Sequence, residues 1–193
     1  MRVIAGKYRS RPLRSLRGMD VRPTSDRLRE TLYNVLTAGN PAALEETVWL
    51  DLFAGTGAVG IEALSRSASF VHFVESSAAA ATLIKNNLQS LGIGEGWQVS
   101  QQDVSRSLRK LEAGNVLADF VFLDPPYRME EAYRSTLEFL AQSRLLKAET
   151  LVIAEHEKKF DPGEEFQPLR RFRKLVQGDA ALSFYRRMTE PLS

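Results

Sequence analysis

Cysteine is absent from the 193 residues of this chain, which excludes disulfides and metal sites built on thiolates. Histidine occurs only twice, at His72 and His156, and both lie in strand-like runs that are far apart, so no histidine-based metal site is expected. No apolar run approaches the roughly 20 residues that a membrane span needs, and the N-terminus lacks the apolar region of a signal peptide. The sequence therefore predicts a cytoplasmic protein that uses no metal and contacts no membrane.

Acidic residues are scarce at the N-terminus, although the whole chain has a net charge of only +2. Residues 1–29 contain nine arginines and lysines against two aspartates, which gives +7 there and −5 over the remaining residues. Gly6, Tyr8 and Pro12 are interleaved with these cations, and such a mixture favours contacts with phosphates and bases. The pattern indicates a basic arm on a body whose hydrophobic fraction, 44% of the whole chain, suits one globular domain.

A strand-like run ends in a tetrapeptide whose groups could bind a nucleobase. Residues 120–123 are Phe-Val-Phe-Leu, and Asp124-Pro125-Pro126-Tyr127 follows them. The Asp124 carboxylate and the Pro125 carbonyl can both accept hydrogen bonds from the exocyclic amino group of a nucleobase, and Tyr127 offers a ring for stacking. The prolines restrict φ and hold these acceptors in place. The same residues also fit an ordinary strand that ends in a proline turn.

Strand, glycine turn and helix follow one another around residues 48–64. The apolar run VWL at 48–50 leads into DLFAGTGAVG at 51–60, which matches the pattern G-x-G-x-x-G. Gly55 and Gly57 permit a tight turn and a close approach to a ligand. Glu75 follows Gly55 by 20 residues at the end of another apolar run, a spacing typical of an acid that binds ribose hydroxyls. A nicotinamide dinucleotide is therefore one candidate ligand.

Asp51 argues against a dinucleotide, because its carboxylate repels a pyrophosphate and attracts the α-ammonium of a methionine moiety. S-adenosylmethionine fits better, with its ammonium near Asp51, its ribose at Glu75 and its methyl group facing Asp124. Asp103 ends another strand-like run, and it either accepts from the adenine amino group or only caps the helix that follows. We therefore predict that S-adenosylmethionine is bound by Asp51, Gly55, Thr56, Gly57, Glu75, Asp103 and Val104.

Strand-like and helix-like segments alternate from residue 47 onward. We expect strands over residues 48–50, 70–75, 97–103, 118–124 and 150–156, helices over residues 77–91 and 130–142, and a short helix that contains Leu108 and Leu111. This alternation predicts an α/β fold with a parallel sheet that is covered on both faces. Asp51, Glu75, Asp103 and Asp124 would then lie together at the carboxyl edge, where open α/β sheets bind ligands.

Further elements are expected on either side of this core. Residues 3–5 and 12–16 are predicted to be two short strands of a hairpin. A helix is expected over residues 24–38, with Thr24 or Ser25 as its N-cap. Residues 172–176 and 181–185 are predicted to form an antiparallel hairpin that closes the edge of the sheet.

These motifs together resemble those of class I S-adenosylmethionine-dependent methyltransferases, whose Rossmann-like sheet has seven strands and ends in an antiparallel hairpin. RVIAGKY at residues 2–8 and RPTSDR at residues 22–27 narrow the resemblance to the RsmD family, which methylates the exocyclic N2 of one guanine in bacterial 16S ribosomal RNA. The resemblance covers nearly the whole chain. It implies S-adenosylmethionine as the cofactor and 16S ribosomal RNA, in a small-subunit ribosomal particle, as the partner.

The resemblance also implies roles for individual segments and residues. Residues 1–20 would be an RNA-binding hairpin, and residues 21–193 would be the methyltransferase domain. Asp124 and Pro125 would hold the guanine amino group in line with the methyl group, and Tyr127 would stack on the unstacked base. The residues expected to contact RNA are Lys7, Arg9, Arg11, Arg14 and Arg22.

Other functions fit parts of the sequence. An adenine-N6 DNA methyltransferase shares the tetrapeptide but usually needs a sizeable target-recognition domain, and another RNA amino-group methyltransferase would share the whole site. A non-catalytic RNA-binding protein would have no need for four acids at one edge. A nicotinamide-dependent oxidoreductase would have no use for Asp124-Pro125-Pro126-Tyr127.

Overall fold

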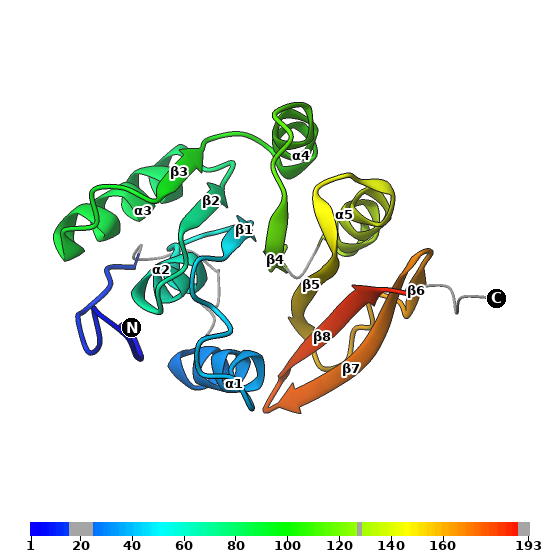
Figure 1. Cartoon of the computed structure of the whole chain (residues 1–193), viewed down its shortest axis with the longest axis horizontal. Coiled ribbons are helices and arrows are strands. Elements are labelled where there is room, and N and C mark those ends of the chain that lie inside the picture. The colour runs from blue at the N-terminus through cyan, green and yellow to red at the C-terminus, as the bar shows by residue number, and fades with distance from the viewer. Residues whose placement is uncertain (16–24, 127–128, 189–193) are drawn as a thin grey trace.

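The computed structural model describes residues 1–15, 25–126 and 129–188 of the chain. An eight-stranded sheet with the order β3-β2-β1-β4-β5-β8-β7-β6 forms the centre of the molecule (Figure 1). The strands are β1 (Val48–Leu52), β2 (Phe70–Val74), β3 (Trp97–Ser100), β4 (Ala118–Leu123), β5 (Leu146–Glu157), β6 (Glu165–Phe166), β7 (Leu169–Gln177) and β8 (Ala180–Arg187). The helices are α1 (Asp26–Leu36), α2 (Ala58–Ser65), α3 (Ala78–Leu91), α4 (Val104–Ala113) and α5 (Glu130–Gln142).

The predicted α/β fold is confirmed, with differences at some boundaries. Strands β1 to β5 pair in parallel, and β7 and β8 form the expected antiparallel hairpin. The sheet has eight strands where seven were expected, because the two residues of β6 pair with the start of β7. The strand predicted over residues 97–103 ends at Ser100, since Asp103 already caps α4. The helix predicted over residues 24–38 runs from Asp26 to Leu36, after an N-cap at Ser25.

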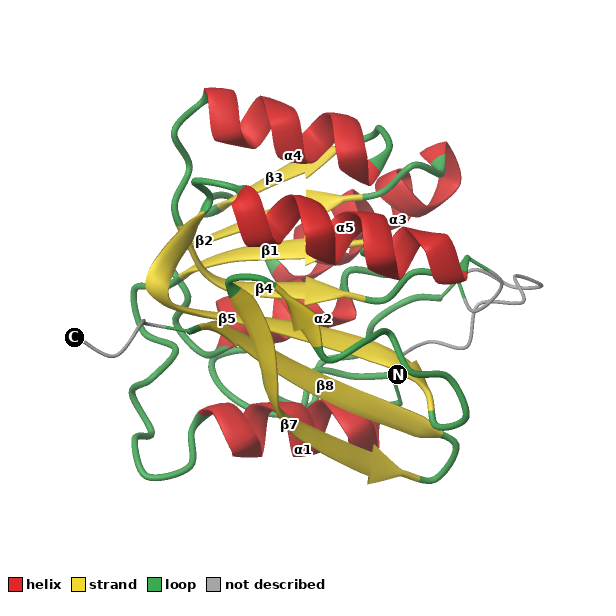
Figure 2. Cartoon of the chain, turned by 90° about the vertical axis from the view of Figure 1, so that its right-hand side faces the viewer, coloured by secondary structure: helices red, strands yellow, loops and turns green. Residues whose placement is uncertain are grey.

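Helices cover both faces of the sheet and bury two apolar clusters. α1, α2 and α3 lie on one face, which we call the α1 face, and α4 and α5 lie on the other (Figures 1 and 2). On the α1 face, Trp49 is fully buried and stacks on Phe120 with ring centroids 4.6 Å apart. On the opposite face, Val121 packs with Leu137 of α5. Because side chains alternate along a strand, each central strand contributes to both clusters and is apolar almost throughout.

The N-terminal arm, residues 1–15, packs against α2. Its two segments are joined by one antiparallel bridge between Arg2 and Pro12, where two short strands were expected. Gly6 has a φ of +79°, and a Cβ added there would lie 1.8 Å from the Ser65 carbonyl oxygen, so only glycine permits this close approach. The Tyr8 amide donates to the Ser65 hydroxyl at 3.0 Å. The arm is therefore attached to the core through its backbone.

Glu62 of α2 makes a second attachment for the arm. Its carboxylate accepts hydrogen bonds from the amides of Ile4 and Ala5 at 2.7 and 2.9 Å. Arg66 also donates to Glu62, at 2.9 Å, so this fully buried carboxylate is well satisfied. The sequence of the arm could not predict this contact, because Glu62 lies more than fifty residues away in the chain.

Arg29 in α1 is buried, although it belongs to the basic N-terminal segment. Its guanidinium donates to the Arg2 carbonyl at 2.7 Å, to the Ala58 carbonyl at 3.3 Å and to the Asp26 carboxylate at 2.6 Å. It therefore joins the arm, α1 and α2, and it is not exposed to a nucleic acid. Within the described residues, no helix is long and apolar enough to cross a bilayer.

Candidate active site

The register of the parallel strands gathers acidic side chains at the carboxyl edge of the sheet. The last paired residues of four neighbouring strands are level with one another: Leu52, Val74, Leu123 and Ala154. An acid follows directly at Glu75, Asp124 and Glu155, and Asp51 lies one residue before the end of β1. The structure therefore brings together three of the four predicted acids, Asp51, Glu75 and Asp124. It adds Glu155, which was not predicted.

Glu155 is an acid that sequence reasoning missed. It lies inside the strand predicted over residues 150–156, and β5 does continue through it to pair Glu155 with Leu182 of β8. The residue is only 2% exposed. One signal for it was present, because an acid directly follows the apolar run at residues 151–154, as Asp124 follows the run at residues 120–123.

Asp51 is buried beneath the glycine turn. Its Oδ2 accepts a hydrogen bond from the Gly60 amide at 2.9 Å, near the start of α2, and the residue is 2% exposed. Burial raises the pKa of Asp51 to about 7, the Gly60 hydrogen bond opposes this rise, and the charge of Glu75 adds to it. A cation placed beside Asp51 would relieve the cost of its buried negative charge.

Glu75 is fixed by backbone amides on both of its carboxylate oxygens. Its Oε2 accepts from the Gly55 amide and its Oε1 from the Ser77 amide, each at 2.8 Å. Gly55 and Gly57 have φ values of +54° and +76°, which fold the turn so that the Gly55 amide points at β2. Each carboxylate oxygen retains a further lone pair that can accept a hydrogen bond from a hydroxyl group.

Asp103 is the N-cap of α4. The sequence left open whether Asp103 caps this helix or accepts a hydrogen bond from adenine. Its Oδ1 accepts from the Arg106 amide at 2.8 Å and from the Ser105 hydroxyl at 2.9 Å. These hydrogen bonds lower the pKa of its exposed carboxyl group, so Asp103 is ionised near neutrality. Val104 begins α4 and is largely buried. Contact of either residue with an adenine ring stays a prediction.

Asp124, directly after β4, is a second acid of this edge whose pKa is raised. Desolvation raises its pKa well above the ordinary value, and the charges of Glu155 and Asp51 raise it further. The residue keeps partial exposure, and the water that reaches it moderates this rise. No residue in the described ranges donates a hydrogen bond to its carboxylate, while its amide lies 3.4 Å from the Leu52 carbonyl. The charge of Glu155 therefore makes the titration of Asp124 depend on its neighbour.

Tyr133 in α5 is a second residue that sequence reasoning missed, because its segment, residues 130–142, was predicted only to be a helix. Its hydroxyl lies 2.8 Å from the Glu155 carbonyl and 3.3 Å from the Pro125 carbonyl, and the residue is 1% exposed. A tyrosine hydroxyl has one proton, so these carbonyls share a single donor. The contact fixes the Pro125 carbonyl relative to β5 and leaves that oxygen a lone pair for another donor.

The basic arm reaches the glycine turn through Asn87, which is fully buried in α3. The Asn87 side chain accepts from the Arg14 amide at 2.9 Å, and it donates to the Arg14 carbonyl at 3.2 Å and to the Thr56 carbonyl at 3.1 Å. The predicted RNA-binding side chains of the arm that the structure describes are all exposed: Lys7, Arg9, Arg11 and Arg14. Arg22 and Tyr127, which were also predicted as site residues, lie outside the described residues.

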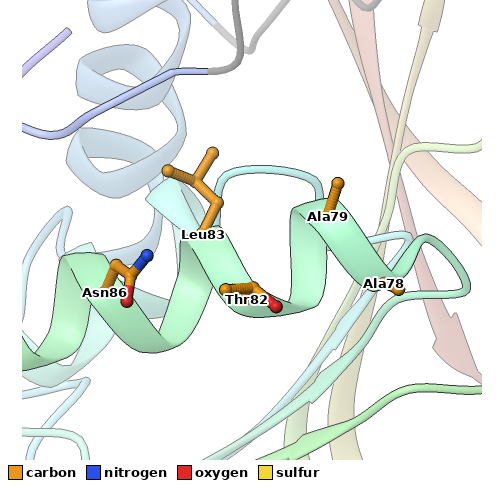
Figure 3. A pocket seen from close by; sticks show the side chains of 5 residues that line it. All are labelled: Ala78, Ala79, Thr82, Leu83 and Asn86. Atoms are coloured by element: carbon orange, nitrogen blue, oxygen red, sulfur yellow. The ribbon is translucent and has the colours of Figure 1, made fainter.

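A shallow concavity of about 450 Å³ runs along the outer surface of α3 (Figure 3). It is lined by Ala78, Ala79, Thr82, Leu83 and Asn86. None of these side chains can transfer a proton near neutral pH, and the acids of the carboxyl edge are not among them. Chemistry is therefore assigned to the carboxyl edge and not to this concavity. Within the described residues, no group of three or more potential ligands is arranged to hold a metal ion.

The arrangement defines a class of protein. A parallel sheet that turns antiparallel after β5, with a glycine turn after β1 and an acid directly after β2, is the architecture of class I S-adenosylmethionine-dependent methyltransferases. The chain is a methyltransferase with this fold. It belongs to the family described as Conserved hypothetical protein 95, whose model matches residues 1–186.

Individual relatives agree with this assignment. The chain is 31% identical over 187 residues to "Putative rRNA methyltransferase YlbH" of Bacillus subtilis, which covers 97% of this chain and 99% of that protein. It is 36% identical over 158 residues to "Ribosomal RNA small subunit methyltransferase D" of Haemophilus influenzae, which covers 82% and 79% of the two chains. The solved structure of "Putative methyltransferase yhhF from Escherichia coli" matches with a TM-score of 0.82 at 31% identity, over 98% of this chain and 99% of that one. The resemblance to the RsmD family is confirmed.

Proposed function

We propose that this chain transfers the methyl group of S-adenosylmethionine to the exocyclic N2 amino group of one guanine in 16S ribosomal RNA. The observation that carries the proposal is the Asp124 carboxylate, which lies beside the cofactor acids and receives no hydrogen bond from the described residues. The Pro125 carbonyl next to it is held by Tyr133. The names of the relatives, which refer to ribosomal RNA and to the small subunit, support the choice of substrate.

The carboxyl edge fits S-adenosylmethionine, which supplies an activated methyl group on its sulfonium. Asp51, whose pKa is raised to about 7 by burial, would hold the α-ammonium, because that cation compensates the desolvated carboxylate. Glu75 is already oriented by the Gly55 and Ser77 amides and would accept from the two ribose hydroxyls. The turn at Gly55, Thr56 and Gly57 would enclose the methionine part, and Asp103 and Val104 would border the adenine.

Asp124 and Pro125 would orient the guanine. The lone pair of N2 is delocalised into the ring, so the amino group is a poor nucleophile until its two hydrogens are bound by acceptors. The Asp124 carboxylate and the Pro125 carbonyl are these two acceptors, and they also stabilise the positive charge that develops on nitrogen. The chemistry forms the N2–methyl bond, breaks the sulfur–methyl bond and leaves an excess proton on N2.

Asp124 would then accept the excess proton. Its raised pKa makes it a better base than an ordinary aspartate while it remains ionised, and Glu155 contributes to that rise. After transfer, the proton would pass to solvent at the partly exposed Asp124 side chain. Neither step needs a metal ion or a redox partner.

The RNA would be held around the site by basic and aromatic side chains. Lys7, Arg9, Arg11 and Arg14 on the exposed arm, together with Arg22, would contact phosphates. Tyr127 would stack on the guanine after it leaves its helix. The substrate proposed is a small-subunit ribosomal particle in the cytoplasm, with residues 1–20 as the RNA-binding segment and residues 21–193 as the methyltransferase domain.

The test is methyl transfer from tritiated S-adenosylmethionine to undermethylated small-subunit particles, followed by nucleoside analysis. Label in N2-methylguanosine is expected. Duplex DNA and protein-free 16S ribosomal RNA are assayed in parallel, and the Asp124→Asn variant is the control for contaminating activity. Label in N6-methyladenosine, or stronger labelling of DNA than of ribosomal RNA, would replace the proposal with adenine-N6 transfer.

A further inference from the structure

A second basic surface lies at the far edge of the sheet. The hairpin of β7 and β8, residues 169–187, contains six arginines and lysines and one aspartate, so it carries +5 although the chain outside residues 1–29 is acidic overall. Figure 1 shows this hairpin and the N-terminal arm on opposite sides of α1. A nucleic acid that is bound only by the arm would not contact the positive charge of this hairpin.

The cations of β7 and β8 are neutralised unequally. On the α1 face, Arg170 lies opposite Arg186 and is paired with Glu165 at 3.0 Å. On the face away from α1, Arg171 is paired with Asp161 at 2.6 Å and with Glu164 at 2.8 Å, and Lys174 is paired with Asp161 at 3.1 Å. On the α1 face, Arg173 and Arg186 are exposed, and no carboxylate of the described residues lies within ion-pairing distance of either. The neutralised cations stabilise the hairpin, whereas these two are available to a partner.

A β-bulge adds an aromatic ring to the unneutralised cations. Arg171 pairs with Tyr185 and Arg173 pairs with Phe184, so Phe172 is the extra residue between them. The Phe172 ring lies 6.4 Å from the Phe184 ring, which is buried on the α1 face, and the Arg186 guanidinium lies 5.0 Å above it. Phe172 is nevertheless 45% exposed. We call Phe172, Arg173 and Arg186 the basic–aromatic patch.

The patch faces the same side of the sheet as the catalytic acids. Phe122 and Ile153 pack in the cluster of the α1 face, and Asp124 and Glu155 lie two residues further along their strands. When the strand pairing is followed across the sheet from Asp124, the residue of β7 at the same level is Leu175. Three strand spacings of ~4.8 Å and about 2.5 residues of ~3.3 Å separate Asp124 from the patch, which gives roughly 17 Å. About five stacked nucleotides, at ~3.4 Å each, cover that distance.

We infer that the basic–aromatic patch binds the ribosomal RNA strand that flanks the target guanine, with phosphates at Arg173 and Arg186 and an unpaired base against Phe172. This inference rests on the proposed function and extends it to a second RNA contact. Charge on an edge strand also opposes edge-to-edge pairing of sheets, but that need does not require an exposed aromatic ring beside the cations.

The test is binding of an unmethylated 16S ribosomal RNA transcript to the full-length chain between 50 and 200 mM salt, which are about the limits within which phosphate contacts are resolved. Arg173→Gln/Arg186→Gln should lower the affinity about ten-fold at the lower salt and reduce the log–log salt slope by about 1.4–1.8. The matched control, Arg134→Gln/Lys174→Gln, removes two cations that are ion-paired in the described structure and should keep the native slope.

Phe172 is tested separately, because stacking does not depend on salt. Phe172→Ala should lower the affinity about ten-fold at an unchanged slope, and Phe172→Trp should restore it. Affinity for S-adenosylmethionine and turnover at saturating RNA should match the native chain in every variant, which shows that the fold is intact.

The outcomes separate this inference from the proposed function. If the native chain methylates ribosomal RNA and the double variant keeps the native slope, the patch inference is overturned and the proposed function stands. If binding to the transcript is unchanged and only binding to the assembled particle weakens, the patch contacts a ribosomal protein, which also overturns it. If the native chain does not methylate ribosomal RNA, the proposed function fails first and the inference fails with it.

Discussion

The two halves of the carboxyl edge hold their acids in opposite ways. In the half proposed to bind the cofactor, which is built from β1 and β2 and is called the cofactor half, Asp51 accepts a hydrogen bond from the Gly60 amide. Glu75 accepts from the Gly55 amide of the glycine turn and from the Ser77 amide after β2. In the transfer half, built from β4 and β5, no described residue donates a hydrogen bond to the Asp124 carboxylate, and Glu155 repels its charge. Under the proposed function, the first half would bind the cofactor through acids that are already oriented, and the second half would accept the hydrogens of the guanine amino group.

This difference has a physical reason. Backbone amides are fixed by the fold, so an acid bound to them is oriented before the ligand arrives and loses little entropy on binding. An acid without such donors keeps its lone pairs free and its pKa high, and both properties favour acceptance of a proton. The comparison predicts that substitutions in the two halves change different quantities, affinity in one and rate in the other.

The largest effect is expected from Asp124→Asn. Asparagine keeps the shape of the side chain but removes the charge that stabilises the developing cation, so transfer should slow by about 10²–10⁴-fold. The dissociation constant of S-adenosylmethionine should change less than about three-fold, since the loss falls on the transition state. Rapid-quench transfer assays and calorimetry measure the two quantities, and a rate near the native one would remove Asp124 from the chemistry.

A smaller effect, on affinity alone, is expected from Glu75→Ala. Loss of charge-assisted hydrogen bonds to two hydroxyls should weaken binding of S-adenosylmethionine by about 1.5–3 kcal/mol. Glu95→Ala removes an exposed acid before β3 and is the matched control. Calorimetry with both variants checks this, and equal dissociation constants for the two would place the ribose elsewhere.

A shift of the pH profile is expected from Glu155→Gln. The charge of Glu155 raises the pKa of Asp124, so its removal lowers that pKa. In the proposed mechanism Asp124 works as a carboxylate, so activity would be lost as pH falls through its pKa, and the acidic limb of the rate profile should move to lower pH. Glu157→Gln, at the exposed end of β5, should leave the limb in place. A shift in the opposite direction would show that the two acids do not interact as described.

The smallest effect is expected from Tyr133→Phe. The hydroxyl shared by the Pro125 and Glu155 carbonyls contributes about 0.5–1.5 kcal/mol, so the transfer rate should fall about two- to ten-fold. Affinity for the cofactor should be unchanged, because Tyr133 lies in the transfer half. Single-turnover assays at saturating cofactor resolve a change of this size, and a weaker affinity with a native rate would contradict the assignment.

The sequence predicts the fold and the positions of Asp51, Glu75 and Asp124 at the carboxyl edge, but it does not predict those of Glu155 and Tyr133. Apolar runs, helical periodicity and the glycine turn are local patterns, and Asp51, Glu75 and Asp124 each end such a run. Glu155 and Tyr133 act through contacts between separate elements, and nothing in their own segments specifies those contacts. The register of β4 against β5 and the packing of α5 decide them.

The arm shows the same limit. Its charge is visible in the sequence, whereas its attachment to Glu62 and Asn87 depends on helices that lie more than fifty residues later. The bulge at Phe172 is a further case, because one extra residue in a strand changes which side chains share a face and leaves no mark in the alternation of the hairpin.

The division of the edge into two halves is tested most directly by single-turnover methyl transfer at increasing concentrations of S-adenosylmethionine, with Glu75→Ala and Asp124→Asn assayed side by side. The account predicts that Glu75→Ala reaches the native rate at a higher cofactor concentration, and that Asp124→Asn saturates at the native concentration with a rate that stays low. If saturating cofactor restored Asp124→Asn, or failed to restore Glu75→Ala, the two halves would not have separate roles.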